Sequence, residues 1–509
     1  MSARQRSCLL FVKLTVFGFV FAQTAHAALT NRYVVKGNAG APPYDSPANA
    51  AGDIQTAIDY ACTEAGSTVL VAAATYDLGG TKVPGRYLTN RVYISKAITV
   101  RSVNNDPTNT IIKGAWDPVT TNGWLAIRCV YMVNGSALVG FTLTNGATIR
   151  TNEVIYDLIS VDANGGGVCA ESTSATISNC IVVNNASFGY NWASSGGGIF
   201  KGTIYNTIIK NNSTILSGGG MGFAVAYDCT LAGNSAGGTG GGTHFGTLYR
   251  CVVSNNSSGS AGGGAYGYPG VYGLGLYDCT LVNNRSISHG GGAASTDSAP
   301  LIMLSNCVVA FNTSAAAGGG VRMGQLFNCL VYSNSPTGIH QSTASNSIFI
   351  ANALAVSFDF YNCLFVGYGV VSYNGQKLYN CTAVGCNGSG FAPNSGTISL
   401  YNCISWSNSA SDTGVSAFNS CGAGNLYTNT LLGNTTNNPQ FVANGSGYGT
   451  THVPGNYRLQ ASSPCVNRGT NGAWTINAFD LDGRTRIRYG TVDMGAYETI
   501  YRGAIFKFR

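Results

Sequence analysis

The sequence predicts an all-β protein, a parallel β-helix in which short strands stack coil upon coil. Between Thr207 and Gly320, five units share one spacing: Cys or Thr at position 0, Asn at +5, and Gly-Gly-Gly from +11. Successive units start 22, 22, 28 and 28 residues apart, so their length varies only after the glycines. A fixed short period of this kind is typical of stacked units that each contact only their neighbours. The units start at Thr207, Cys229, Cys251, Cys279 and Cys307.

The composition fits one long repetitive body. Of the 509 residues, 45% are hydrophobic and only 9% are charged, and 69 are glycine. Disordered chains combine low hydrophobicity with high charge, and this chain has neither property. A continuous apolar core is therefore expected along the repeat.

Residues 1–27 are predicted to be a secretory signal peptide. Arg4 and Arg6 precede the apolar run 14–22, and Ala25-His26-Ala27 fits a cleavage site. The run is too short to span a bilayer, so no transmembrane span is expected. Removal of this segment lowers the net charge from +7 to about +4 and leaves no basic stripe for nucleic acid. We expect a protein that is secreted or held at the outer cell surface.

Residues 28–150 are predicted to hold an N-terminal cap and the first coils. The spacing of Ile54, Ala57, Ile58 and Ala61 predicts a short helix that Asp53 caps. Such a helix would cover the open apolar end of the solenoid and its unpaired strand edges. Strands are expected at 68–72, 91–94, 98–103, 110–113 and 137–144.

Residues 151–436 are predicted to be the β-helix repeats. In one unit, Leu276, Cys279 and Leu281 are the inward candidates, and the gap of three between the first two requires a corner at Tyr277-Asp278. The asparagine at +5 marks a second corner and the glycines a third. Three short strands and three corners make one coil. About 13 such coils would form a shaft roughly 60 Å long.

The asparagines at +5 are expected to form a ladder that pairs their amides from coil to coil. The ladder would satisfy polar groups at a buried corner, so its role is structural. Its predicted members are Asn212, Asn234, Asn256, Asn284 and Asn312 of the five units, extended by Asn145, Asn185, Asn334, Asn352 and Asn408.

The cysteines are predicted to form an inward column of free thiols, because free cysteine packs as a small hydrophobe. Disulfides between stacked neighbours stay open as the alternative. The pattern lacks the paired CxxC or His spacings of zinc sites, so neither a metal nor another cofactor is expected. The column consists of Cys180, Cys229, Cys251, Cys279, Cys307, Cys329, Cys363, Cys381 and Cys403.

These features resemble two groups of proteins with the right-handed parallel β-helix of the pectate-lyase-like superfamily. The units with Asn followed by Gly-Gly-Gly, such as 312–321, resemble the repeats of polymorphic outer-membrane proteins. The closing region 437–509 resembles the end of bacterial choice-of-anchor Q domain proteins. The motifs that carry this second likeness are Asn438-Pro439-Gln440-Phe441, Tyr457-Arg458-Leu459, Ser463-Pro464-Cys465, Asp480-Leu481-Asp482-Gly483-Arg484 and Asp493-Met494-Gly495-Ala496-Tyr497-Glu498. Together the likenesses imply a right-handed solenoid at the cell surface.

One group of polar residues is a candidate ligand-binding site. Asp228, Arg250 and Asp278 each precede the first residue of a unit, and tyrosines precede them, so both sets should stack at an outward corner. The two longer units add insertions that we expect beside this corner. The candidate residues are Asp228, Tyr249, Arg250, Tyr277 and Asp278 from the corner, Tyr266, Tyr268, Tyr272 and Asp297 from the insertions, and His289 before a triplet. His244 and His340 are expected to be isolated surface residues.

Three interpretations of this group stay open: a structural charge and tyrosine ladder, a glycan-binding surface, and a catalytic site. Enzymes that cleave glycans need paired carboxylates or clustered acids, and no Asn-Thr-Asp or Asp-Asp pair occurs between Ser172 and Tyr457. We therefore expect an exported adhesive or glycan-binding protein with a polysaccharide or cell-surface glycan as partner. A polysaccharide lyase or glycoside hydrolase is the alternative.

Overall fold

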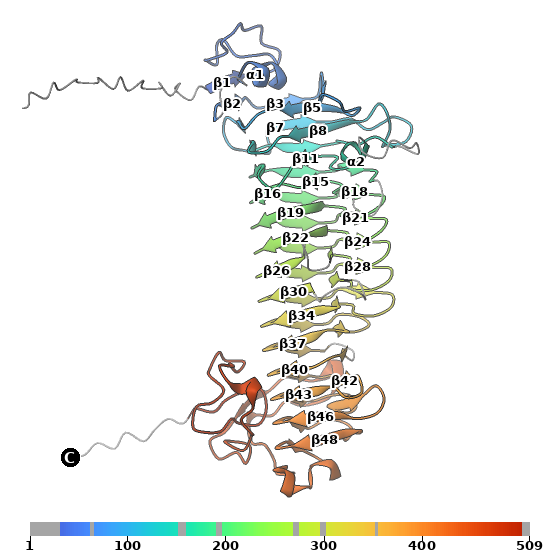
Figure 1. The fold of residues 1–509 in the computed structure, drawn as a ribbon, viewed down its shortest axis with the longest axis vertical. Coiled ribbons are helices and arrows are strands. Elements are labelled where there is room, and N and C mark those ends of the chain that lie inside the picture. Colours follow the sequence, from blue (N-terminus) through green and yellow to red (C-terminus); the bar gives the residue numbers. More distant parts are fainter. Residues whose placement is uncertain are drawn as a thin grey trace, which may run out of the picture.

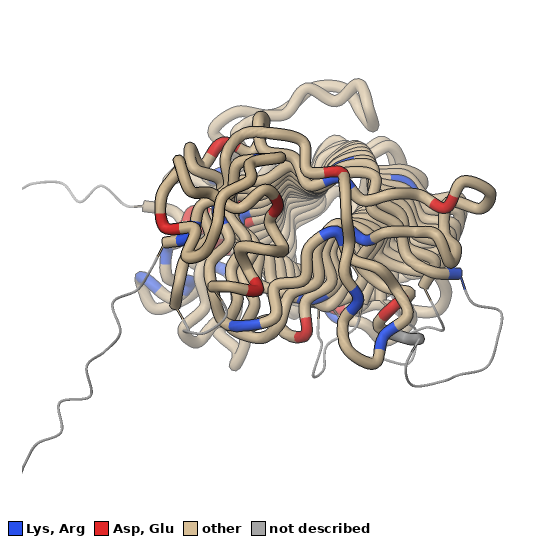
Figure 2. Tube along the Cα trace, turned by 90° about the horizontal axis from the view of Figure 1, so that it is seen from above, with Lys and Arg blue, Asp and Glu red and all other residues tan. Residues whose placement is uncertain are grey.

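The chain folds as a right-handed parallel β-helix, which confirms the predicted fold class (Figure 1). The computed structural model describes residues 31–61, 66–150, 159–189, 196–267, 274–295, 302–351 and 355–500. Viewed along the shaft, successive coils repeat nearly the same outline, and the few charged positions lie around it (Figure 2).

A 28-stranded sheet forms two faces of the shaft, which join at β19 (Met221–Tyr227) and β22 (Thr243–Tyr249). A bend separates the faces within these strands, where Phe223 and Phe245 have φ values of 55°. The first face consists of β4 (Thr81–Lys82), β5 (Thr89–Ile94), β8 (Ile127–Met132), β11 (Val168–Ala170), β15 (Ile199–Phe200), β25 (Ala265–Tyr266), β29 (Ala293–Ala294), β33 (Val321–Arg322), β36 (Ile339–His340), β39 (Ala355–Ser357), β42 (Val370–Ser372) and β45 (Phe391–Pro393). The second face consists of β1 (Asn31–Val34), β2 (Thr68–Val71), β6 (Thr99–Ser102), β9 (Ala137–Val139), β12 (Thr176–Ser178), β16 (Thr203–Tyr205), β26 (Gly275–Tyr277), β30 (Ile302–Ser305), β34 (Gly324–Phe327), β37 (Thr343–Ser345), β40 (Phe360–Tyr361), β43 (Lys377–Tyr379), β46 (Ile398–Tyr401) and β48 (Val415–Phe418).

A 15-stranded sheet follows the second face around the first corner, and a 6-stranded sheet follows the second corner. The larger one contains β3 (Ala74–Tyr76), β7 (Thr110–Lys113), β10 (Thr142–Thr144), β13 (Ile181–Val183), β17 (Ile208–Lys210), β20 (Thr230–Ala232), β23 (Val252–Ser254), β27 (Thr280–Val282), β31 (Val308–Ala310), β35 (Leu330–Tyr332), β38 (Ile348–Ile350), β41 (Leu364–Val366), β44 (Thr382–Val384), β47 (Ile404–Trp406) and β49 (Cys421–Gly422). The smaller one contains β14 (Ala186–Ser187), β18 (Ser213–Thr214), β21 (Ser235–Ala236), β24 (Ser257–Ser258), β28 (Arg285–Ser286) and β32 (Thr313–Ser314). Fifteen strands exceed the 13 coils expected, because the first coils lack the cysteine that marks the repeat.

The N-terminal end is closed by the predicted helix, α1 (Ile54–Ala61). Ile54, Ala57, Ile58 and Ala61 are buried, as their spacing predicts. Asp53 caps the helix, since its carboxylate accepts a hydrogen bond from the Thr56 backbone N–H at 2.9 Å. A second short helix, α2 (Ile159–Asp162), precedes β11.

The asparagine ladder runs without a break from Asn185 to Asn334. In each step, one Oδ1 accepts from both the backbone N–H and the Nδ2 of the asparagine in the preceding coil; for Asn256 and Asn234 these distances are 2.9 and 3.0 Å. The Asn256 Nδ2 also donates to the Leu231 carbonyl at 2.9 Å. Every ladder amide is thus satisfied at a buried corner. The members are Asn185, Asn212, Asn234, Asn256, Asn284, Asn312 and Asn334.

The predicted extensions of the ladder have mixed outcomes. Asn408 accepts from the Cys386 backbone N–H at 2.9 Å and so occupies the expected position. The prediction for Asn145 was wrong. Its φ of 56° is typical of the residue that precedes a ladder position. The next residue, Gly146, occupies that position, and its backbone N–H donates to the Asn185 side chain. Asn352 lies outside the described residues.

The cysteine column points inward as predicted. All fourteen cysteines among the described residues are free and buried. The Cys251 thiol donates to the carbonyls of Ala226 and Tyr249 at 3.6 and 3.3 Å. Thr207, Ser347 and Ser420 replace cysteine in three coils, and each donates its hydroxyl to the carbonyl two residues before it. The position therefore selects a small donor.

The glycine triplets let the coils approach closely. The first glycine of a triplet has a left-handed backbone, with a φ of 66° at Gly240. A Cβ on the next one, Gly241, would lie 2.3 Å from the Ser257 carbonyl oxygen. Two earlier triplets, which the repeat spacing did not include, join the same stack: 165–167 donates to 196–198, and 196–198 to 218–220.

The C-terminal region, residues 437–500, leaves the coil path and folds back along the shaft (Figure 1). Its apolar side chains, including Phe441, Leu459 and Met494, pack on the outer side of the 15-stranded sheet, where Leu364 and Ile404 lie. The region contains the antiparallel pair β50 (Phe441–Ala443) and β51 (Asn456–Leu459) and the 3₁₀ helices η3 (Gly449–Thr451) and η4 (Ala473–Thr475). The helices η1 (Asn425–Tyr427) and η2 (Thr430–Leu432) precede it. No helix of the described residues is long and apolar enough to cross a membrane.

Candidate functional site

In the twelve coils from Asn179 to Asn419, the first corner is made by one residue in the left-handed conformation, and we call this series the corner column. L-residues avoid this conformation, and Asn and Asp tolerate it best. The backbone therefore explains Asp228 and Asp278 without any function. The column consists of Asn179, Asn206, Asp228, Arg250, Asp278, Asn306, Asn328, Asn346, Asn362, Asn380, Asn402 and Asn419, with φ values between 46° and 55°. Arg250 alone in this column is neither Asn nor Asp.

Arg250 forms a two-point ion pair with Asp228 of the preceding coil. Its Nε and one terminal nitrogen each donate to a carboxylate oxygen at 2.7 Å. Both side chains are about half exposed, at 54% and 44%. The hydrogen bond from Arg250 lowers the pKa of Asp228 below its ordinary value. Asp228 is thus held as a paired carboxylate, unsuited to donate a proton to a leaving group.

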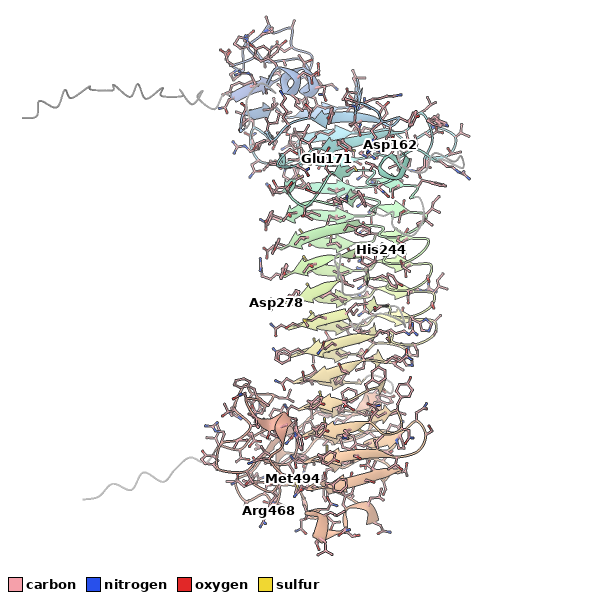
Figure 3. The ribbon with its side chains drawn as sticks, in the orientation of Figure 1. Asp162, Glu171, His244, Asp278, Arg468 and Met494 are labelled. Carbon is pink, nitrogen blue, oxygen red and sulfur yellow. The ribbon has the colours of Figure 1, made fainter. Side chains whose placement is uncertain are left out.

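Asp278 belongs to a chain of side-chain hydrogen bonds that runs down the corner. Its carboxylate accepts from the Asn306 amide at 3.1 Å, and the Asn306 carbonyl oxygen accepts from the Asn328 amide at 2.7 Å. Asp278 lies at the left edge of the shaft in Figure 3, above the C-terminal region where Arg468 and Met494 are labelled. The corner thus offers polar groups along its length. Among its described residues, there is no pair of free carboxylates.

The tyrosines next to the corner column stack ring on ring. Centroid distances are 5.2 Å for Tyr205 and Tyr227, 4.8 Å for Tyr227 and Tyr249, and 5.0 Å for Tyr249 and Tyr277. The planes of each pair lie within 14° of parallel. Since each inner ring has a neighbour on both faces, it presents its edge and hydroxyl to solvent, and only an end of the stack can offer a face.

The same register position continues along the second face, and we call it the ring column. After Tyr277 come residues of alternating size, and then a second stack in which Tyr361, Tyr379 and Tyr401 follow one another at 4.9 and 5.2 Å. Trp474 of the C-terminal region lies against this second stack, 4.4 Å from the Tyr379 ring. The register of the column is Tyr205, Tyr227, Tyr249, Tyr277, Ser305, Phe327, Ser345, Tyr361, Tyr379, Tyr401 and Phe418.

The structure therefore brings together Asp228, Tyr249, Arg250, Tyr277 and Asp278. The remaining candidates lie elsewhere or beyond the described part of the chain. Tyr266 belongs to the first face, where its ring stacks on that of His244 at 5.6 Å. His289 lies after the second corner, with Nδ1 at 2.6 Å from the Ser288 hydroxyl. Tyr268, Tyr272 and Asp297 lie outside the described residues.

His244 is not the surface residue expected from the sequence, because it is only 4% exposed. It packs against Phe223 and Phe245 at the bend between the two faces. Burial lowers the pKa of His244 to about 3, so the imidazole is neutral. Figure 3 shows it on the other side of the view from Asp278. The alternation of inward and outward residues along a strand could have predicted this aromatic cluster. The bend interrupts that alternation, and the sequence does not reveal where it occurs. His340 is half-buried.

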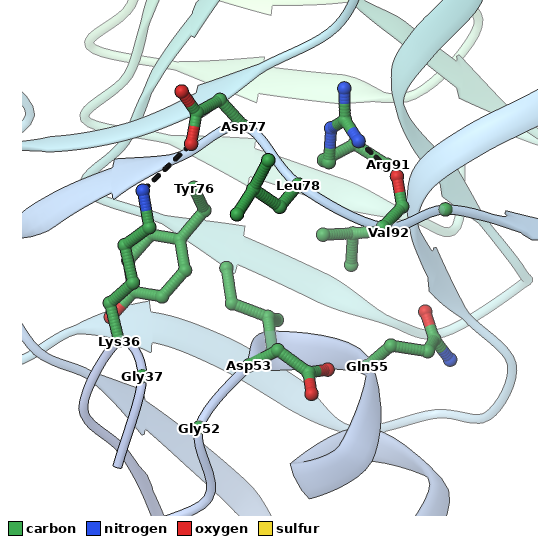
Figure 4. A pocket seen from close by; sticks show the side chains of 13 residues that line it. Lys36, Gly37, Gly52, Asp53, Gln55, Tyr76, Asp77, Leu78, Arg91 and Val92 are labelled. Carbon is green, nitrogen blue, oxygen red and sulfur yellow. Dashed lines mark hydrogen bonds and ion pairs between the residues drawn. The ribbon is translucent and has the colours of Figure 1, made fainter.

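A pocket of about 310 Å³ lies at the N-terminal end, between α1 and the strands β3 and β5 (Figure 4). The Lys36 ammonium donates to the Asp77 carboxylate at 2.7 Å, and the Arg91 Nε donates to the Lys113 carbonyl at 2.8 Å. These charges are satisfied within the protein, and the Asp53 carboxylate caps the helix. The pocket was not predicted, since its lining residues share no motif.

The described residues contain no cluster of His, Cys, Asp and Glu able to hold a metal ion. Among the acidic residues near the end of the chain, Asp482 pairs with Arg458 and Arg484, and Asp480 binds the backbone. The Asp480 carboxylate accepts from the backbone N–H groups of Asp482, Arg484 and Glu498 at 2.7 to 2.9 Å. This arrangement caps turns.

No protein-family model and no curated protein matches the chain. Solved structures align with it over long stretches at low identity. A pectate lyase aligns with 14% identity over 92% of this chain and 97% of its own, with a TM-score of 0.26. The A-module of an Azotobacter vinelandii mannuronan C-5 epimerase aligns with 12% identity over 73% and 94%, with a TM-score of 0.39. A tailspike capsular polysaccharide depolymerase of an Acinetobacter baumannii bacteriophage aligns with 12% identity over 80% and 60%, with a TM-score of 0.21.

Proposed function

We propose that this protein is an exported, cell-surface or secreted shaft that binds a polysaccharide along the corner formed by Asp228, Tyr249, Arg250, Tyr277 and Asp278. The observation that carries the proposal is Arg250. At a position where the backbone favours Asn or Asp, the chain places an exposed arginine beside tyrosines and carboxylates. Aromatic rings with nearby hydrogen-bonding groups suit sugars, which have apolar ring surfaces and hydroxyl edges.

Binding rather than cleavage fits the charges at this corner. Retaining and inverting glycosidases use two carboxyl groups, one of which must give a proton to the leaving group. Asp228 is neutralised by Arg250, and Asp278 accepts a hydrogen bond from Asn306. The alternative, a polysaccharide lyase or glycoside hydrolase, therefore has no assigned acid and base at the corner.

Export follows from the same proposal, because a polysaccharide of the cell surface is met outside the cell. The apolar run and the small residues before Ala28 predict the route. N-terminal sequencing of the purified extracellular protein should find a chain that begins near Ala28. A chain that retains residues 1–27 in the cell interior would contradict this part of the proposal.

Affinity electrophoresis in gels that contain neutral or acidic polysaccharides tests the binding surface. The double variant Arg250→Ala/Tyr277→Ala should lose retention and still melt cooperatively, because damage in a solenoid stays near the altered coils. A matched control changes the same residue types on the other two sheets, Arg285→Ala/Tyr332→Ala, and should keep retention. Retention that survives the corner variant would place the site elsewhere. New reducing or unsaturated chain ends in the same incubation would favour the enzyme.

A further inference from the structure

Two serines interrupt the ring column, and each one leaves a gap between aromatic residues. Ser305 pairs in register with Tyr277 on one side and Phe327 on the other. Ser345 pairs with Phe327 and with Tyr361. Every other position from Tyr205 to Phe418 in this column is aromatic. Ser305 and Ser345 are therefore the two positions without a ring among the eleven of this column.

The width of each gap matches one ring. Neighbouring parallel strands lie about 4.8 Å apart, so residues two coils apart are separated by about 9.6 Å. A ring placed midway would lie about 4.8 Å from the residue on each side. The rings already stacked in this column have centroid distances of 4.8 to 5.2 Å. A ligand ring in either gap would thus continue the stack at its own spacing.

Tyr277 and Tyr361 end their stacks at these gaps, and their orientations make them suitable walls. The Tyr277 ring is 14° from parallel to Tyr249, and the Tyr361 ring is 10° from parallel to Tyr379. Each therefore turns a ring face toward the gap. Phe327, between the two gaps, is 48% exposed.

The second gap opens on a surface hollow of about 250 Å³. Ser345 and Tyr361 line it together with Gln325, Thr343 and Asp359. At the first gap, Met303 reaches the Tyr277 hydroxyl at 3.6 Å and is 42% exposed, so a flexible side chain borders it. Hydroxyl, amide and carboxylate groups thus surround both gaps.

We propose that each gap holds one neutral pyranose ring of a polysaccharide, with the ring parallel to the flanking aromatic rings and the chain leaving the gap across the shaft. This inference rests on the proposed function and specifies its ligand class. The ring would stack on Tyr277 or Tyr361, and its hydroxyls would bond to the polar rim. Asp278 borders the first gap through its bond with Asn306, and Asp359 borders the second. These carboxylates repel acidic sugars, so a neutral chain fits better than a polyuronate.

Part of the ring column is covered by the C-terminal region. Farther along the shaft, Trp474 packs on Tyr379 and on Tyr401, with centroid distances of 4.4 and 5.8 Å. Its Nε1 donates to the Asn380 side chain of the corner column at 3.0 Å. The Trp474 ring is tilted by 40° and 53° to these two tyrosine rings, which already stack on each other, so it covers the side of the stack and bonds to a corner amide.

The decisive variant fills both gaps, Ser305→Tyr/Ser345→Tyr. Tyrosine is tolerated throughout this column, so the variant should fold and melt at the wild-type temperature or above. Ser178→Tyr is the matched control, since Ser178 precedes Tyr205 in register and its replacement lengthens the stack without filling a gap. The probes are galactomannan, xylan and dextran as neutral chains, and alginate and polygalacturonate as acidic ones, in affinity electrophoresis.

We expect the wild type and Ser178→Tyr to be retained by at least one neutral chain, and the filled variant to bind it about tenfold more weakly or worse. Equal retention of the filled variant would overturn the gaps as the site, and the proposed function would survive. Retention by acidic chains alone would overturn the neutral class. If no probe retains the wild type, both the gaps and the proposed function fail. A filled variant that melts well below wild type would contradict the gaps, since it would show that they cannot accept a ring.

Discussion

Arg250 binds Asp228 of the preceding coil at two points, with both N–O distances at 2.7 Å, while its backbone has a φ of 53°. An arginine in the left-handed conformation is disfavoured where an asparagine would be accommodated. Exposed ion pairs stabilise folded proteins little, because solvent screens them and ordering the side chains costs entropy. The pair therefore does not account for the presence of arginine at this position.

The variant Arg250→Asn separates stability from binding. It restores the residue type that the corner column uses in most coils, so its melting temperature should equal or exceed that of the wild type. Retention on polysaccharide gels should fall if Arg250 contacts the ligand. Thermal unfolding by circular dichroism checks the first expectation. A melting temperature lower by several degrees would show that the ion pair holds the corner together.

Loss of a ladder asparagine should reduce the free energy of unfolding far more than loss of an exposed asparagine. Asn256→Ala removes the acceptor of the Asn234 backbone N–H and amide and the donor to Asn284, so it should cost about 1–3 kcal/mol of unfolding free energy. Asn387 is exposed, and Asn387→Ala should cost little. Urea titration of both variants provides the comparison. Equal midpoints would argue against a stabilising ladder.

The column thiols should be unreactive in the native protein. Cys229, Cys251, Cys279 and Cys307 are 1 or 2% exposed, and a thiol must be reached as a thiolate to react. Labelling with a maleimide should be slow until denaturant is added. Rapid labelling of the four in the folded state would refute the inward assignment.

The stability of the C-terminal region should fall as the pH rises from about 5 to 8. Glu498 is 4% exposed and lies 3.3 Å from the buried Arg486 guanidinium. Burial raises the pKa of Glu498 to about 8, opposed by Arg486 and assisted by Asp493 and Asp480. Because the folded carboxyl group binds its proton more tightly than the unfolded one, this contribution is complete at low pH and is lost as the pH passes through about 8.

Tryptophan fluorescence can follow this change, since Trp474 belongs to the same region. Urea midpoints of the wild type and of Glu498→Gln, compared at pH 5 and pH 8, measure the effect. Glutamine stays neutral, so the variant should lose less stability over this interval than the wild type. Parallel losses in the two proteins would assign the pH dependence to other groups.

The parts of the fold that repeat were predictable from the sequence. The ladder amides, the inward thiols and the helix 54–61 each follow from spacing, because one inward or corner position recurs in every coil. Asn145 failed since a neighbouring asparagine can serve the left-handed position instead of the ladder. The triplet at 196–198 was missed because it starts 11 residues after Asn185, whereas the triplets of the five units start 6 residues after their asparagine. The triplet at 165–167 follows a coil whose ladder position is Gly146 and not an asparagine.

The candidate site was predicted less completely. Residues that are close in the sequence lie on different faces of the shaft when a bend separates their strands. Tyr266 and Tyr277 belong to adjoining strands of one unit, yet the first lies on the first face and the second on the second. The stacking of Tyr249 and Tyr277 follows from the period, but the orientation of their rings does not. Spacing therefore predicts that the tyrosines stack, but not that the inner rings present only their edges to solvent.

During folding, closure of the coils over the cysteine column competes with oxidation of its thiols. In the unfolded chain its nine thiols are accessible, and an oxidising compartment forms disulfides within seconds to hours. Adjacent coils place equivalent Cα atoms about 4.8 Å apart, within the range that a disulfide spans. A link from Cys229 to Cys279, which skips Cys251, would exclude the coil between them. If the protein is exported as we propose, each coil must therefore close over its thiol before the thiol is oxidised, and slow winding would leave cross-links that have to be exchanged before the coils can stack.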